Sequence, residues 1–223
     1  LWLTGDVASA IDLAERGAAI AFRIGWSRGR VAAGANLACL YVCSGRLKEA
    51  QERIQQASRE TFSSPSFKLA LADTKVRALL ASGDYAAAEA ILEANQPELQ
   101  SQPWYELTFR QTQVELLRRM SRWPEAIAKL STCIQSARQA RLQTLLTGFQ
   151  LTEAEILVES ESHPDLSSIP LTETHEGWPL GLIGGFHLVL GKALSASHQE
   201  ARGRSHRARA VRIFEGAGDL MAA

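Results

Sequence analysis

The sequence predicts an all-α fold of stacked antiparallel helix pairs. A short motif recurs about every forty residues: a small residue, a polar residue, a large apolar residue, and alanine five positions after the small one. Between the motifs, apolar residues recur at spacings of three and four, which is the pattern of one face of an amphipathic helix. Strand-like alternation of apolar and polar residues is absent from the sequence.

The small residue that starts each motif, called the anchor below, predicts a tight turn between two helices. The four anchors, 40, 38 and 38 residues apart, are Gly5, Gly45, Gly83 and Ser121. Glycine in the left-handed conformation can end one helix and allow the next to begin at once. The alanines that follow the anchors are small enough for a close helix crossing, and they are Ala10, Ala50, Ala88 and Ala126. Each repeat is therefore a first helix, a turn and a second helix.

In chain order, the pattern predicts a second helix after Gly5 and then three complete pairs around the next three anchors. A fifth first helix is predicted from about 141 to 159. Its second helix cannot follow, because prolines at 164, 170 and 179 interrupt residues 160–179. We expect an irregular, ordered excursion there. A last pair is predicted at 180–197 and 199–216, within residues 180–223.

The motif resembles the tetratricopeptide repeat, whose second helix opens as Gly83-Asp84-Tyr85-Ala86-Ala87-Ala88 does in this chain. The resemblance covers residues 1–140 clearly, and within 1–159 the repeats are regular. The repeat period of 38 to 40 residues is longer than the period of about 34 residues that is usual in the family. In addition, arginine replaces the family's aspartate after two of the four anchors. The resemblance implies a single domain over 1–223, a right-handed superhelix (α-solenoid). Such long repeats are similar to those in sensory regions of large bacterial transcription regulators, so we expect a fragment of a larger protein.

In the tetratricopeptide family, first helices form most of a concave face, and ligands lie along it. Counting six and ten residues back from the anchors, and including two arginines near the end of the fourth first helix, gives candidate residues for a groove that binds a protein, a peptide or a small ligand. These are Asp73, Arg77, Gln111, Glu115, Arg118, Arg119, Glu155 and Lys192. The alternative is a solvated wall whose charges pair with one another.

Other clusters have simpler interpretations. Cys39 and Cys43 are four residues apart on a helix, but no Cys or His nearby completes a zinc site, so core cysteines are favoured. The histidines at 163 and 175 are assigned to a polar loop. Five arginines between 202 and 212 make the last helix basic, which fits a solvated outer face or a contact with nucleic acid.

Composition narrows the function classes. Lys and Arg number 24, as do Asp and Glu, so the net charge is zero and nucleic acid is an unlikely partner. Three cysteines are an odd count, which favours a reducing, cytoplasmic location over a disulfide framework. No apolar run approaches the about 20 residues of a membrane helix, so we expect no membrane contact.

The sequence therefore predicts a non-catalytic interaction module within a larger bacterial regulatory protein, acting in transcription or signalling. We expect it to bind a protein, a peptide, a small ligand or another domain of the parent chain, without cofactor or metal. No nucleophile with its base and no paired carboxylates are recognisable. The alternatives are an accessory domain that contacts nucleic acid through the arginine-rich last helix, or a non-catalytic domain of a larger enzyme.

Overall fold

The computed structural model describes residues 6–59, 65–95, 103–160 and 179–217. Within these ranges the chain forms ten α-helices and no strand, and 88% of the described residues are helical. The predicted all-α class is confirmed. The first anchor, Gly5, and most of the predicted excursion, residues 161–178, lie outside the described residues.

The helices follow the predicted repeat. Helix α1 (Val7–Arg23) is the second helix after the first anchor. The three complete pairs are α2 (Ser27–Cys43) with α3 (Leu47–Ser58), α4 (Pro65–Ser82) with α5 (Tyr85–Ala94), and α6 (Pro103–Arg119) with α7 (Trp123–Gln139). The fifth first helix is α8 (Gln143–Ser160), and the last pair is α9 (Leu180–Ala196) with α10 (Glu200–Ala217).

The three described anchors adopt the left-handed backbone conformation, which the sequence predicts for the two glycines. The φ angles of Gly45, Gly83 and Ser121 are 71°, 80° and 56°. At each anchor, the next backbone N–H donates to a carbonyl five residues earlier, as from Asp84 to Leu79 at 3.0 Å. This satisfies a carbonyl that the helix end leaves without a partner within the helix.

The same turn closes the other described tight junctions. It occurs after α1 at Gly25 and after α7 at Arg141, with φ of 69° and 55°. It also joins α9 to α10 at His198, with φ of 60°. His198 is therefore the anchor of the last pair, although its side chain gives no turn signal in the sequence.

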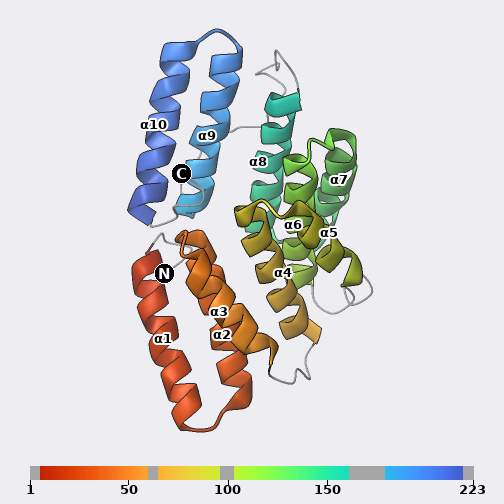
Figure 1. Cartoon of the computed structure of the whole chain (residues 1–223). Helices are drawn as coiled ribbons and strands as arrows, with labels where there is room; N and C mark the ends of the chain where they lie inside the picture. The colour runs from red at the N-terminus through yellow and green to blue at the C-terminus, as the bar shows by residue number, and fades with distance from the viewer. Residues whose placement is uncertain (1–5, 60–64, 96–102, 161–178, 218–223) are drawn as a thin grey trace.

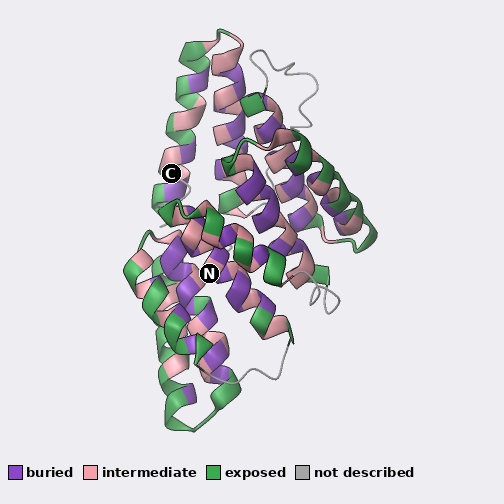
Figure 2. Cartoon of the chain, turned by 45° about the vertical axis from the view of Figure 1, so that its right-hand side comes forward, coloured by how far each residue is buried: buried purple, intermediate pink, exposed green. Residues whose placement is uncertain are grey.

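The helices form two layers. The first helices α2, α4, α6, α8 and α9 pack side by side in this order, and α3, α5, α7 and α10 each pack against the first helix of their own pair. The series curves, so that α9 and α10 lie above α1 and α2 in Figure 1. Figure 2 shows the buried residues facing the neighbouring helices and the exposed residues on the outer faces.

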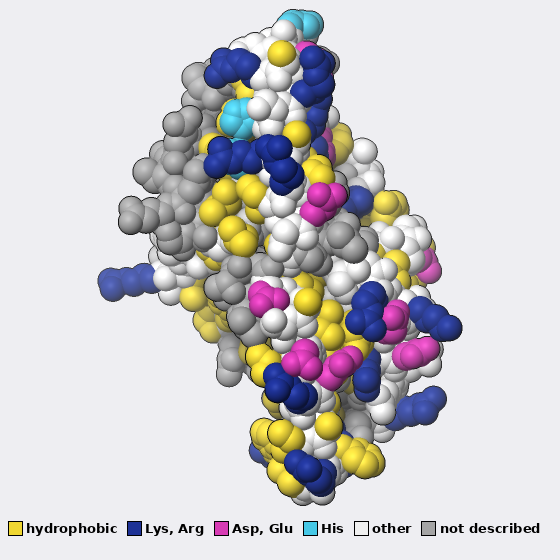
Figure 3. Space-filling model, turned by 90° about the vertical axis from the view of Figure 1, so that its left-hand side faces the viewer, with side chains coloured by type: hydrophobic (Ala, Val, Ile, Leu, Met, Phe, Trp, Pro, Cys, Tyr) yellow, Lys and Arg dark blue, Asp and Glu magenta, His cyan; other side chains and the backbone are white. Residues whose placement is uncertain are grey.

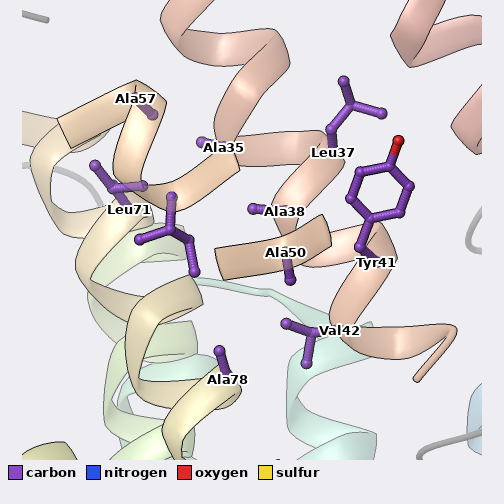
Figure 4. Close-up of a cluster of buried hydrophobic side chains, with 10 residues drawn as sticks. Ala35, Leu37, Ala38, Tyr41, Val42, Ala50, Ala57, Leu71 and Ala78 are labelled. Atoms are coloured by element: carbon purple, nitrogen blue, oxygen red, sulfur yellow. The ribbon is translucent and has the colours of Figure 1, made fainter. Parts of the chain in front are cut away.

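Small residues allow the two layers to approach closely. Ala50, Ala88 and Ala126 are fully buried, as expected for alanines at helix crossings. Figure 4 shows Ala50 of α3 close to Ala38 of α2, within a cluster that also includes Leu71 of α4. None of the helices in the described part of the chain combines the length and apolarity needed to cross a membrane.

The last pair uses glycine at the same position. Gly203 stands five residues after His198, where the other pairs have alanine. A Cβ added to Gly203 would lie 2.8 Å from the carbonyl oxygen of Gly191, and one added to Gly191 would lie 3.0 Å from the carbonyl oxygen of Gly203. Helices α9 and α10 therefore cross with their backbones almost in contact.

Candidate functional site

A groove of about 730 Å³ runs across all five first helices. Each of these helices contributes lining residues, and Phe214 of α10 also lines the groove. The contributing residues recur at fixed distances before the anchors, because positions four apart in sequence lie on one face of a helix. The sequence register therefore places the polar lining residues of α4, α6 and α8 on the same side of the layer.

Seven of the eight predicted site residues line this groove. They are Arg77 from α4, Gln111, Glu115, Arg118 and Arg119 from α6, Glu155 from α8, and Lys192 from α9. Asp73 is not among the lining residues. Its carboxylate accepts hydrogen bonds from Arg77 Nε at 2.7 Å and from the hydroxyl of Thr112, so it orients one lining side chain and joins α4 to α6.

Arg118 is the centre of an ion-pair network that joins three first helices. Its side chain is 12% exposed, and its guanidinium contacts Glu115 on its own helix at 2.8 Å. It also contacts Glu159 of α8 at 2.8 Å and Glu155 of α8 at 3.3 Å. Lys192 of α9 contacts the same two carboxylates, Glu155 at 2.6 Å and Glu159 at 2.8 Å. The network thus extends from α6 through α8 to α9.

The environment of the network favours the ionised forms of Glu115, Glu159 and Lys192. Burial of Glu115 opposes ionisation, but hydrogen bonds and charge from Arg118 and Arg119 outweigh it, so the pKa of Glu115 is lowered. Burial also opposes ionisation of Glu159, whose pKa is lowered by Lys192 and Arg118. For Lys192 burial disfavours the charged form, yet Glu155 and Glu159 raise its pKa. Each charge is therefore compensated within the groove wall.

The lining residues from the first half of α8, from the part of α9 before Lys192, and from α10 are mostly apolar. They include Leu151, Leu182, Leu188, Val189 and Phe214. Gly148 of α8 and Gly185 of α9 also line the groove, and a Cβ added to either would meet no atom closer than 3.7 Å. The missing side chains leave room for a ligand to approach these two helices. The groove thus combines a charged, internally paired part with an apolar part.

Several lining residues were not predicted from the sequence. If the 40-residue spacing is continued from Ser121, the next anchor position is 161, and Glu159 stands two residues before it. Cys43, Ala81 and Arg119, which also line the groove, stand two residues before their own anchors. Counting back by two would therefore have found Glu159. The apolar residues of α9 and α10 gave no such signal, because apolar side chains in a helical stripe are usually buried in the core.

The cysteines partly differ from the prediction. Cys39 and Cys43 were predicted to be core residues, but both are only half-buried and Cys43 lines the groove, whereas Cys133 is buried. Within the described residues, no group of three or more His, Cys, Asp and Glu side chains lies close enough together to hold a metal ion.

Comparison with solved structures shows a similar fold. No family model matches the chain, and no curated protein matches it. The chain is similar to BtubC (BKLC) from P. vanneervenii. The crystal structure of that protein aligns with a TM-score of 0.60, covering 94% of this chain and 91% of BtubC at 14% sequence identity. At this identity the likeness concerns the fold alone, and it fits an all-helical, repeat-like architecture.

Proposed function

We propose that the chain is a non-catalytic interaction module that holds a segment of a protein in the groove. The segment belongs to a partner protein or to another domain of the parent chain. The observation that carries the proposal is that one groove crosses all five first helices. An extended or helical segment of a protein has the length to contact several successive helices, whereas a compact small molecule contacts fewer.

The chemistry of the lining favours a segment with large apolar side chains. Leu182, Leu188 and Phe214 offer apolar surface, and Gly148 leaves space beside them. The charged residues are already paired with one another, so an ionised ligand gains little by displacing those pairs. A segment that buries apolar side chains at α8 and α9 gains the transfer free energy of those groups.

Within this proposal the finer architecture is that of a tetratricopeptide-like, right-handed α-solenoid. The regular anchors, the close crossings at alanine or glycine, and the layer of first helices support it. The proposed setting is a larger bacterial regulatory protein of transcription or signalling, as the long repeat period suggests.

A displayed library of random peptides, selected on the purified chain, tests the proposal. We expect selected peptides to be rich in large apolar residues. Replacing Gly148 with Trp should fill the groove and weaken binding of a selected peptide by roughly tenfold or more, as measured by fluorescence anisotropy. Ala128→Trp is the matched control, because Ala128 lies exposed on α7, outside the groove lining, and should leave binding unchanged.

Two results would contradict the proposal. One is that no peptide is enriched over a library passed over an unrelated helical protein. The other is that Gly148→Trp and Ala128→Trp bind the selected peptides as tightly as the original chain.

A second candidate function is contact with nucleic acid through α10. Arg202, Arg204, Arg209 and Arg212 are exposed on this helix, and Figure 3 shows basic side chains over the upper part of the molecule, where α10 lies. Binding of labelled DNA and RNA that weakens steeply with salt would favour this function. The neutral net charge of the chain opposes it.

A further inference from the structure

Helix α1 carries an exposed apolar stripe that none of the described helices covers. Two residues of the helix, Leu13 and Ile20, are 50% and 49% exposed. Ile24, which caps the C-terminal end of the helix, is 65% exposed. Gly17 lies between Leu13 and Ile20 in sequence and is exposed, and a Cβ added to it would meet no atom within 4 Å. Figure 3 shows hydrophobic side chains at the lower end of the molecule, where α1 lies. We call these four residues the α1 stripe.

The α1 stripe is distinct from the face that packs on α2. Its members are separated by four, three and four residues, which places them along one side of a helix. The buried residues of α1 are Val7 and Ala21, which stand on a different side. Spacings of three and four are also those of the contact positions of two helices packed along their length.

The order of residues in the stripe is self-complementary. Leu13 and Ile24 are equally far from its midpoint, and so are Gly17 and Ile20. If a second α1 packs against the first in the antiparallel direction, Ile20 of each copy faces Gly17 of the other. The glycine then provides the space that the isoleucine fills. A two-fold arrangement makes this contact twice.

Charge along the helix fits the same arrangement. Asp12 and Arg23 are eleven residues apart, close to three turns, so they stand on the same flank of the stripe. In the antiparallel pair, Asp12 of one copy lies about two residues, or roughly 3 Å along the axis, from Arg23 of the other. The Asp12 side chain is 65% exposed, even though it pairs with Arg16 at 2.8 Å. Two ion pairs can therefore form between the copies.

We propose that two copies of this chain associate through an antiparallel contact between their α1 stripes. The stripe from Leu13 to Ile24 extends over about 17 Å of helix, which is short compared with the interfaces of permanent dimers. The dimer should therefore dissociate on dilution, with a dissociation constant in the micromolar range. This contact involves the end of the helix series and leaves the groove accessible to its own ligand.

The test is the molar mass of the full chain by light scattering after size exclusion, from about 1 to about 100 µM. We expect the mass of two chains at the upper concentrations. Ile20→Arg should give a single chain throughout, since the charge would face Gly17 of the other copy. Phe22→Arg is the matched control: Phe22 is 73% exposed but lies outside the stripe, so the dimer should persist. Circular dichroism of both variants checks that they fold.

A charge exchange tests the antiparallel geometry. Asp12→Arg should weaken the dimer at least threefold, and adding Arg23→Asp in the same chain should restore most of the loss, because the pair is rebuilt with opposite polarity. A single chain at every concentration would overturn the proposal and indicate that another segment or protein covers the stripe. A dimer that persists in folded Ile20→Arg, or one abolished by Phe22→Arg, would equally overturn it.

Discussion

At each described tight junction between helices, one residue adopts the left-handed backbone conformation, and the identity of that residue affects the stability of the fold. Three of these residues are glycines, which adopt this conformation at little cost. The other three, Ser121, Arg141 and His198, carry a Cβ that crowds the following carbonyl oxygen. The same turn conformation thus occurs at each of these junctions whether or not the residue is glycine. At Ser121, Arg141 and His198 it forms although the backbone conformation is unfavourable for the residue.

Exchanging residues at two junctions tests this explanation. Arg141→Gly should raise the free energy of unfolding by about 1 kcal/mol, because the left-handed strain is removed. Gly83→Ala should lower it by about 1 kcal/mol or more, because alanine must adopt the φ of 80°. Chemical denaturation of both variants measures the two changes, and equal shifts in the same direction would contradict the explanation.

At the same scale, the ionisation of Glu115 links stability to pH. Its folded pKa lies below the ordinary value of 4.5, so its contribution is fully present above that value and is lost as the pH falls below it. Thermal denaturation between about pH 6 and pH 3 should show a smaller loss of stability in Glu115→Gln than in the original chain. Glu52→Gln, at an exposed position, should behave like the original chain.

At the scale of the element, helices α9 and α10 cross at very short range. The backbones approach so closely at Gly191 and Gly203 that neither position has room for a side chain. The packing of this pair thus depends on glycine, although glycine weakens each helix taken alone.

Two glycine-to-alanine substitutions separate these effects. Gly203→Ala should destabilise the chain by about 1 to 3 kcal/mol, because the added Cβ meets backbone atoms. Gly185→Ala should stabilise it by about 0.5 to 1 kcal/mol, because its Cβ would lie at an ordinary 3.7 Å from Leu151. Thermal unfolding followed by circular dichroism tests both signs, and stabilisation by Gly203→Ala would show that α9 and α10 can separate without loss.

At the scale of the whole molecule, ion pairs as well as helix packing join successive helix pairs. Arg118 of α6 and Lys192 of α9, the helices on either side of α8, contact the same two carboxylates of α8. The network therefore connects α6 to α9. The groove wall and the connection between the last pair and the preceding helices therefore share the same residues.

Two adjacent arginines provide a matched comparison for this network. Arg118→Leu removes a cation that three partly buried carboxylates share, those of Glu115, Glu155 and Glu159, and should cost roughly 2 to 3 kcal/mol. Arg119→Leu removes an ion pair whose arginine side chain is 49% exposed, and should cost no more than about 1 kcal/mol. Urea denaturation gives both values, and similar losses for the two variants would mean that the network does not hold α8 and α9 in place.

The sequence by itself determined the helices, their junctions and the side of each first helix that meets the groove. These features follow from local spacing: Arg77, Glu115 and Glu155 each stand six residues before an anchor position, and one helical period relates all such sets. The tertiary structure alone decided which charges pair between helices and that Phe214 reaches the groove. Those contacts join residues distant in sequence, and they depend on how successive helix crossings add up to the curvature of the whole series, which no local pattern specifies.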